Sequence, residues 1–487
     1  MGLLNLLSAN RSENLFLPAH GRGNALPKNI KTLLRLRPGI WDLPELFEIG
    51  GPLISEGAIA ESQKSSAYEV GVDRCWYGVN GATGLLQSSL LALARPGQAV
   101  LMPRNIHKSC IQACLFGGLT PLLFDVPYLT DRGHASVFDR KWLQRVLKKA
   151  KEFEDDIAAV VLVNPTYQGY SADMESLIKE IHSHSLPVLV DEAHGAYLIS
   201  QIRPDLPKSA ISFGADLVVH SLHKSASGLV QSAVLWSQGD KVDPFKIERT
   251  IELLQTSSPS SLLLASCESS IKELIESKGI KKLRSCIEEA EVLKDFLIKN
   301  EVPLLKNSDP LKIILHTSKF GLSGIEVDKS FIRKRMIGEL AEPGTLTFCL
   351  GLSSHKRLGK RFVRIWNEIL KACGKQKPCF FKRPPFSIVS KPYKSYSDSW
   401  GSNFEKVNLK DAIGRISVEM VCPYPPGIPL LIPGEILDEA RVDWLIEQKS
   451  FWPEQISDFV RVISLSLIHI SEPTRQAEIS YAVFCLK

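Results

Sequence analysis

The sequence lacks the features that would tie this protein to a membrane or to a metal ion. No segment approaches the roughly 18 consecutive apolar residues that a membrane span needs, and the N-terminal stretch MGLLNLLSANRSENLF has neither a basic start nor a cleavage site. The 10 cysteines form no CxxC pair, and no cluster of cysteine and histidine has the spacing of a zinc site. We therefore expect reduced thiols in a cytoplasmic protein without a metal.

An excess of charge of one sign is also missing. The chain of 487 residues carries 59 basic and 53 acidic residues, which gives a net charge of +6. The basic residues are scattered, and this favours solvated surfaces over a face that binds nucleic acid. Because 44% of the residues are hydrophobic, a chain of this length can bury a large core without disulfides.

Short apolar runs alternate with helix-like stretches between about residues 70 and 240. The expected strands are residues 99–102, 120–124, 157–163, 187–191, 216–220 and 232–236. The expected helices are residues 85–94, 107–116 and 174–184. This alternation predicts an α/β protein with a doubly wound, mostly parallel sheet. The continuous apolar character of the strands fits a sheet that is covered on both faces.

The residue pattern changes several times along the chain, and these changes predict the order of its domains. We expect an N-terminal arm at residues 1–50, a large domain at 51–245, a smaller α+β domain at 246–375 and a C-terminal module at 386–463. In the smaller domain, residues 271–299 are predicted to form one or two amphipathic helices, and 312–315 and 346–350 are predicted strands. A stretch rich in proline and lysine separates the last two segments.

The final residues, 465–487, read LSLIHISEPTRQAEISYAVFCLK. They resemble a conceptual translation of sequencing-library adapters. We interpret this stretch as a non-native tail and expect the natural sequence to be lost near Ser464.

Two motifs at the ends of predicted strands carry the strongest functional signal. Asp191, in DEAHGAYL, ends one apolar run, and Lys224, in HSLHKS, follows another. Open α/β sheets bind ligands at the carboxyl ends of their strands. There a carboxylate can keep a pyridine nitrogen protonated, and a lysine that has lost its charge can form an imine. Either residue alone is better explained as a cap or surface group, but together they predict an enzyme that uses pyridoxal 5′-phosphate (PLP).

The motif NGATG, at residues 80–84, opens one of the predicted helices. Small residues at a helix N-terminus expose backbone N–H groups to an anion. We assign the cofactor phosphate to Ala82, Thr83 and Gly84. The motif by itself is weak, since such turns often only cap a helix.

Three other polar residues follow predicted strands and should lie at the same edge of the sheet. His107, in PRNIHKS, is placed to stack on a flat heteroaromatic ring, although a capping or core histidine is about equally plausible for this residue alone. Thr166, in NPTYQG, and His194, in DEAHGA, are placed to bond the phenolic oxygen of the cofactor or the substrate. The convergence of these segments at one edge is the basis of the prediction.

With these motifs in hand, the chain resembles the Orn/Lys/Arg decarboxylase family, whose members are PLP enzymes of fold type I with an aminotransferase-like fold. The resemblance covers roughly residues 15–462. The matching pieces, in order, are LFLPAHGRG, VNGATGLLQ, MPRNIHKS, NPTYQG, DEAHGA, HSLHKS, TSSPSSLLLAS and EMVCPYPPGIPLLIPGE. Without a receiver-like N-terminal domain, the chain is most similar to the short, biosynthetic-type branch.

The resemblance implies a role for each residue that would contact the cofactor ring. Lys224 would carry PLP as a Schiff base, and Asp191 would pair with the ring nitrogen. His107 would stack on one face of the ring, and Ala193 would pack beneath the other.

It also implies roles around the phosphate and the substrate. Ser221 and His223 would help to bind the phosphate, and His223 would protonate the carbon that has lost carbon dioxide. Ser257 and Ser258, in TSSPSS, look like a segment that reaches the cofactor of a neighbouring subunit, so a homodimer is expected. Glu419, in EMVCPYPPG, would lie near the mouth of the site and contact the substrate.

The expected function is therefore the decarboxylation of a basic amino acid, with arginine ranked first, lysine second and ornithine third. The expected partner is this small-molecule substrate, with no nucleic acid and no membrane. Two alternatives stay open, because fold alone does not decide chemistry. One is another PLP reaction on the same fold, such as transamination, and the other is a binding protein without catalytic activity.

Overall fold

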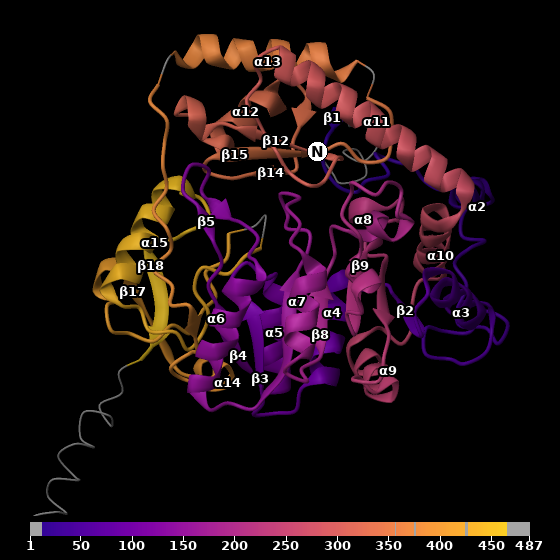
Figure 1. Ribbon diagram of the computed structural model, residues 1–487, viewed down its shortest axis with the longest axis horizontal. Helices are drawn as coiled ribbons and strands as arrows, with labels where there is room; N and C mark the ends of the chain where they lie inside the picture. Colours follow the sequence, from indigo (N-terminus) through magenta and orange to yellow (C-terminus); the bar gives the residue numbers. More distant parts are fainter. Residues whose placement is uncertain (1–11, 356, 375, 424–426, 465–487) are drawn as a thin grey trace, which may run out of the picture. The chain divides into compact units, whose positions relative to one another are not determined.

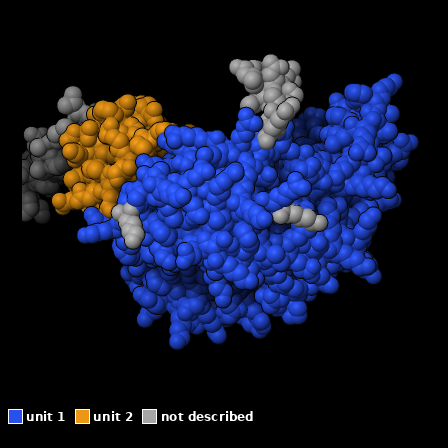
Figure 2. Space-filling view, turned by 90° about the horizontal axis from the view of Figure 1, so that it is seen from above, with its two compact units in different colours: residues 1–391, 423–429 blue, residues 392–422, 430–487 orange. Residues whose placement is uncertain are grey.

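The computed structural model of the protein describes residues 12–355, 357–374, 376–423 and 427–464. The tail interpreted as non-native lies outside the described residues. The chain divides into two compact units, which Figure 2 shows in different colours. The first unit runs to residue 391 and takes in the stretch around residues 423–429, and the second holds residues 392–422 and those from 430 onward.

An eight-stranded sheet lies at the centre of the first unit (Figure 1). Its strands, in spatial order, are β16 (Val389–Ser390), β4 (Thr120–Phe124), β3 (Ala99–Pro103), β7 (Ile157–Val163), β8 (Val188–Asp191), β9 (Leu217–Ser221), β10 (Ala233–Ser237) and β2 (Arg74–Gly78). Strands β4, β3, β7, β8 and β9 run parallel. The outer strands β16, β10 and β2 pair antiparallel. The predicted mostly parallel sheet is therefore confirmed.

Helices pack against this sheet in two groups. The first group contains α4 (Gly81–Leu93), α5 (Lys108–Gly117) and α9 (Pro244–Leu254), of which α5 and α9 both contact α4. The second contains α6 (Arg140–Ala150) and α7 (Met174–His182), which contact each other. Helix α4 begins four residues earlier than predicted, so the NGATG motif forms its first turn instead of a preceding loop.

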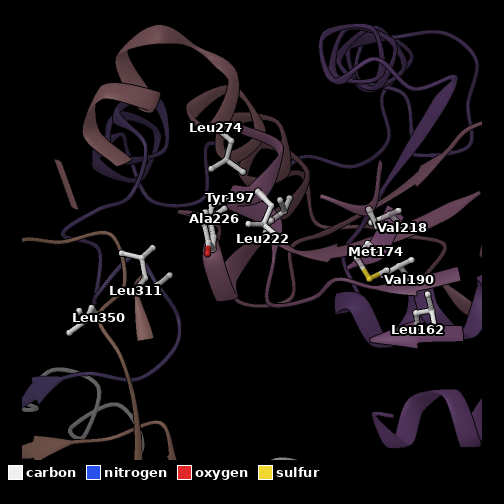
Figure 3. Packing of buried hydrophobic residues seen from close by; sticks show 14 of the residues in the cluster. Leu162, Met174, Val190, Tyr197, Val218, Leu222, Ala226, Leu274, Leu311 and Leu350 are labelled. Atoms are coloured by element: carbon white, nitrogen blue, oxygen red, sulfur yellow. The ribbon is translucent and has the colours of Figure 1, made fainter. Parts of the chain in front are cut away.

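Buried side chains from neighbouring strands form the core. Leu162 of β7, Val190 of β8 and Val218 of β9 lie in one hydrophobic cluster, and Met174 at the start of α7 packs beside them (Figure 3). All the residues of β3, β8, β9 and β10 are buried. These buried central strands thus position the loops that follow them.

A second, smaller sheet belongs to the same unit. It contains β11 (Leu304–Leu305), β12 (Lys312–His316), β15 (Thr345–Cys349) and β14 (Leu340–Ala341), all antiparallel. Helices α11 (Ser277–Lys299), α12 (Gly324–Arg333) and α13 (Leu358–Cys373) lie along it (Figure 1). The strands and the amphipathic helices predicted here are present, and the helical stretch begins earlier, with α10 (Ser261–Ile275).

The N-terminal arm is attached to this smaller part of the unit. Strand β1 (Glu13–Asn14) pairs with β13 (Met336–Ile337), and Leu15 is fully buried. The backbone N–H of Ala19 donates to the carbonyl of His223 over 2.8 Å, which ties the arm to the loop that carries Lys224.

The second unit is built around a two-stranded antiparallel ribbon. Its strands are β17 (Phe404–Asn408) and β18 (Phe459–Ile463), and its main helix is α15 (Glu439–Phe451). Leu431, Leu445 and Val462 are fully buried within it. Across the described parts of both units, no helix is both long enough and apolar enough to span a membrane.

Candidate active site

Lys224 and Asp191 lie at the same edge of the central sheet. Asp191 is the last residue of β8 and stands in register with Val219 of the parallel neighbour β9. Lys224 lies two residues after the start of the one-turn helix α8 (Leu222–Ser225), which directly follows β9. The strand-end placement that the sequence predicted for both residues is therefore present.

The amine of Lys224 is held among aromatic and acidic side chains. Its Nζ lies 3.2 Å from Nε2 of His194 and 5.7 Å from the ring centroid of Tyr167. Burial lowers the pKa of Lys224, and the carboxylates of Asp191 and Glu339 oppose this shift. A lowered pKa leaves more of the lysine as the neutral amine, the form that attacks an aldehyde carbon.

Asp191 is a buried carboxyl group, with 6% of its surface exposed. Burial raises its pKa, and the positive charge of Lys224 partly offsets that effect. The backbone N–H of Ala193 donates to its Oδ1 over 3.2 Å and fixes its orientation. The carboxyl group is therefore ready to pair with a cationic ring nitrogen, which would replace the solvation it has lost.

Three histidines surround Lys224, and all three have lowered pKa values. Burial, together with the charge of Lys224, lowers the pKa of His107 to about 4 and that of His223 to about 4. The same causes lower the pKa of His194 well below its usual value. At neutral pH all three rings are uncharged, so the site presents flat, neutral imidazoles to a ligand.

Local hydrogen bonds orient two of these rings. His107 caps α5, because its Nδ1 accepts from the backbone N–H of Ser109 over 3.3 Å. The capping role considered for His107 is thus real, and its ring still lies close enough to Lys224 to interact with its charge. Ser221 Oγ lies 3.1 Å from Nδ1 of His223, which brings together two residues predicted for the phosphate.

Tyr167 and Glu339 were not anticipated from the sequence. The hydroxyl of Tyr167 donates to Oε1 of Glu339, and the backbone N–H of Leu17 donates to Oε2 over 2.8 Å. The ring of Tyr167 lies 4.3 Å from that of His194, centroid to centroid. Lys312 donates from Nζ to the Tyr167 carbonyl over 2.8 Å. These contacts join the loop after β7, the smaller sheet and the N-terminal arm around Lys224.

For the other predicted site residues, the contacts that the structure shows are not with Lys224. The Thr166 hydroxyl accepts a hydrogen bond from the N–H of Tyr170 over 3.2 Å, within the loop that follows β7. The neighbouring residue, Tyr167, is the one whose ring approaches Lys224. Ser257 and Ser258 are exposed. Glu419 belongs to the second unit, where its carboxylate accepts from the Arg461 guanidinium over 2.6 Å.

The residues predicted to bind the phosphate lie in the first turn of α4. Ala82 and Gly84 are buried in the first turn of α4, whereas the side chain of Thr83 is exposed. Asn80, at the N-cap, gives the helix no side-chain hydrogen bond. Gln255 lies against this turn, and its place could not be read from the sequence because it lies on the segment after α9.

Two family models cover most of the chain. Residues 17–314 match the major domain of Orn/Lys/Arg decarboxylases, and residues 375–452 match their C-terminal domain. The chain belongs to this family. The predicted decarboxylase of basic amino acids is therefore confirmed at the level of the family, and the alternative of another reaction on the same fold loses its support.

Individual proteins agree with the family assignment. The decarboxylase is 27% identical to the arginine decarboxylase of Bacillus subtilis (strain 168), over 88% of this chain and 89% of that protein. It is 22% identical to the inducible lysine decarboxylase of Escherichia coli (strain K12), over 80% of this chain and 67% of that one. A crystal structure of a Francisella novicida lysine decarboxylase superposes with a TM-score of 0.73 at 18% identity, over 87% and 74% of the two chains. This likeness confirms the predicted fold.

Proposed function

We propose that this decarboxylase uses PLP to convert arginine to agmatine, with lysine as the second candidate substrate and ornithine as the third. The environment of Lys224 is the observation that supports the proposal. Burial lowers the pKa of this lysine, and its Nζ lies 3.2 Å from Nε2 of His194. Its charge also interacts with the buried carboxyl group of Asp191. Arginine is ranked first because three arginine decarboxylases, 27–28% identical to this chain, match it over 88% of its length.

The residues at the sheet edge fit PLP. A buried carboxyl group suits the ring nitrogen, a lysine of lowered pKa suits the aldehyde carbon, and a neutral imidazole suits the ring face. The first turn of α4 and the Ser221–His223 pair offer donors for a phosphate. When bound, PLP supplies a protonated heteroaromatic ring that withdraws electrons from the bond to the departing carboxylate.

Each residue would contribute a distinct action. Lys224 would attach the cofactor through Nζ, and Asp191 would keep the ring nitrogen protonated by its negative charge. His107 would hold the ring plane from one side, while Ala193 would pack beneath it. His223 would give a proton to the substrate carbon. Because a pKa of about 4 leaves its ring uncharged at neutral pH, the ring would first have to gain that proton from another group of the loaded site.

Tyr167 and Glu339 add a positioning role to this set. The Tyr167 ring contacts His194, and its hydroxyl is fixed by Glu339, so His194 is held in place beside the amine of Lys224. Thr166 and His194 remain proposed partners of the cofactor's phenolic oxygen. This arrangement keeps the reacting groups oriented, which is the main contribution of a protein to a cofactor reaction.

We further propose a homodimer in which Ser257 and Ser258 approach the partner's cofactor. Their exposure in the single chain supports this role. Glu419 is proposed to contact the substrate, in the C-terminal module bounded by residues 386–463. The other predicted segments, an arm at 1–50, a large domain at 51–245 and a smaller domain at 246–375, remain proposals, as does the cytoplasmic location.

A substrate panel tests the proposed function. The purified protein, with PLP added, is given arginine, lysine or ornithine, and carbon dioxide and the amine product are measured for each. The proposal expects release of carbon dioxide with agmatine from arginine as the fastest reaction. Formation of a keto acid instead, or no amine from any of the three, would refute it.

A further inference from the structure

The side-chain amide of Gln255 is buried against the first turn of α4. A Cβ atom built on Gly84 would lie only 2.6 Å from Nε2 of Gln255, so this glycine leaves the space that the amide occupies. Nε2 is buried and has no hydrogen-bond acceptor among the described residues. Buried donors in folded proteins nearly always have a partner, so this amide calls for a ligand that accepts a hydrogen bond.

The N-terminus of α4, beside this amide, also has backbone N–H groups without an acceptor in the described chain. The first four N–H groups of a helix have no acceptor within it. Gly81 donates to the carbonyl of Gln231 over 2.9 Å, and Asn80 provides no side-chain cap. The N–H groups of Ala82 and Thr83 have no acceptor in the part of the chain that the structure describes. Two backbone donors and one amide donor therefore gather at one place.

The charge of this place favours an anion. A helix N-terminus carries a partial positive charge, and α4 spans 13 residues. The side chain of Thr83, the only hydroxyl in NGATG, is exposed. The buried side-chain donor next to this turn is therefore Gln255.

We propose that Gln255 binds the cofactor phosphate within its own subunit, together with the N–H groups of Ala82 and Thr83. The proposal rests on the proposed function, because it takes PLP to be the ligand. In this proposal, residues of the segment after α9 contribute to two different cofactor sites. Gln255 contacts α4 of its own subunit, whereas the exposed Ser257 and Ser258 would approach the cofactor of the partner subunit.

The test compares ligands with and without a phosphate. Cofactor-free protein is titrated with pyridoxal 5′-phosphate and with pyridoxal, and its thermal stability is measured with and without inorganic phosphate. The variants are Gln255→Leu, which removes the donor at similar volume, and Gln255→Asn, which shortens its reach by one carbon. Gln98→Leu, beside the start of β3, is the matched control for the same change elsewhere.

We expect both Gln255 variants to lose about tenfold to a hundredfold in affinity for pyridoxal 5′-phosphate, the usual effect of a hydrogen bond to a charged group. Affinity for pyridoxal and the behaviour of Gln98→Leu should be unchanged, and inorganic phosphate should stabilise the wild type more than the variants. If the variants keep the wild-type preference for the phosphorylated ligand, the Gln255 proposal is wrong. If the wild type binds neither aldehyde, it is the proposed function that fails.

Discussion

The amine of Lys224 lies 3.2 Å from Nε2 of His194, within hydrogen-bonding distance. Burial lowers the pKa of both groups, and the positive charge of Lys224 lowers that of His194 further. His194 is therefore neutral at neutral pH, and its free nitrogen can accept a hydrogen bond from the lysine ammonium. By accepting this hydrogen bond, the histidine can stabilise the charged form of the amine.

Replacing His194 should change the pH dependence of cofactor attachment. In His194→Leu the ammonium loses its acceptor, so the pKa of Lys224 should fall further and attachment of PLP should be fast at lower pH than in the wild type. His194→Gln keeps an acceptor and should stay near the wild type. The measurement is the rate of PLP attachment against pH for the three proteins. An unchanged profile in His194→Leu, or a shift to higher pH, would contradict this role.

Asp191→Asn should separate activity from stability. Loss of the negative charge should lower kcat by at least about a hundredfold, in the range of single electrostatic contributions to catalysis. Because burial raises the pKa of Asp191, its ionised form is disfavoured in the fold. The cofactor-free variant should therefore melt at the same temperature as the wild type or higher. Steady-state kinetics and thermal unfolding measure the two effects, and a clear loss of stability with full activity would oppose this view.

The lowered histidine pKa values predict a loss of stability in mild acid. An unfolded histidine takes up a proton near pH 6.5, whereas His107 and His223 resist protonation until about pH 4 in the folded protein. The unfolded chain therefore binds more protons between these values, and the free energy of unfolding falls as the pH drops through this window. Denaturant unfolding of the cofactor-free protein at several pH values measures the slope.

The variant His107→Phe isolates one of these contributions, because it keeps a flat ring but cannot titrate. Its free energy of unfolding should fall less steeply than that of the wild type between about pH 6.5 and about pH 4. Equal slopes in the two proteins would show that His107 is not held neutral by the fold.

A buried network next to Asp191 should be important for stability. The carboxylate of Glu192, fully buried, accepts from the N–H of Ala210 over 2.9 Å and lies 2.7 Å from Nε2 of His220. Trp236 donates to the other ring nitrogen of His220 over 2.8 Å. Removing one partner leaves the others unpaired, so Glu192→Ala should lower the free energy of unfolding by about 3–5 kcal/mol.

Denaturant unfolding measures this loss, and an exposed glutamate provides the control. Glu152 pairs with Lys149 at the surface. Glu152→Ala should therefore change the free energy of unfolding by no more than about 0.5 kcal/mol. A similar effect for both variants would mean that the Glu192 network adds little.

Much of the fold could be predicted because the central strands have a simple pattern. Strands β7 and β8 are buried on both faces, so their sequences are continuous apolar runs. Strand β2 was missed because its sequence, RCWYG, begins with a charged residue and contains no β-branched side chain. The start of α4 was misplaced because glycine and threonine in NGATG favour a turn over a helix when tertiary packing is unknown.

The site was predictable where its residues follow strands and not where distant segments meet. Asp191 ends an apolar run, and Lys224 and His107 lie within four residues of the ends of β9 and β3, so their shared edge follows from the parallel sheet. Glu339, which directly precedes β14, reaches Tyr167, and no local pattern in the sequence indicates that contact. Gln255 is another such case, since only the packing of α9 on α4 brings it to the helix end.

The central claim is that Lys224 is the attachment point of the cofactor. The direct measurement is reduction of the protein with borohydride in the presence of pyridoxal 5′-phosphate, followed by digestion and mass spectrometry of the peptides. We predict one stoichiometric pyridoxyl modification, on Lys224, and none in the variant Lys224→Ala. A modification spread over surface lysines, or one that persists in Lys224→Ala, would contradict the claim.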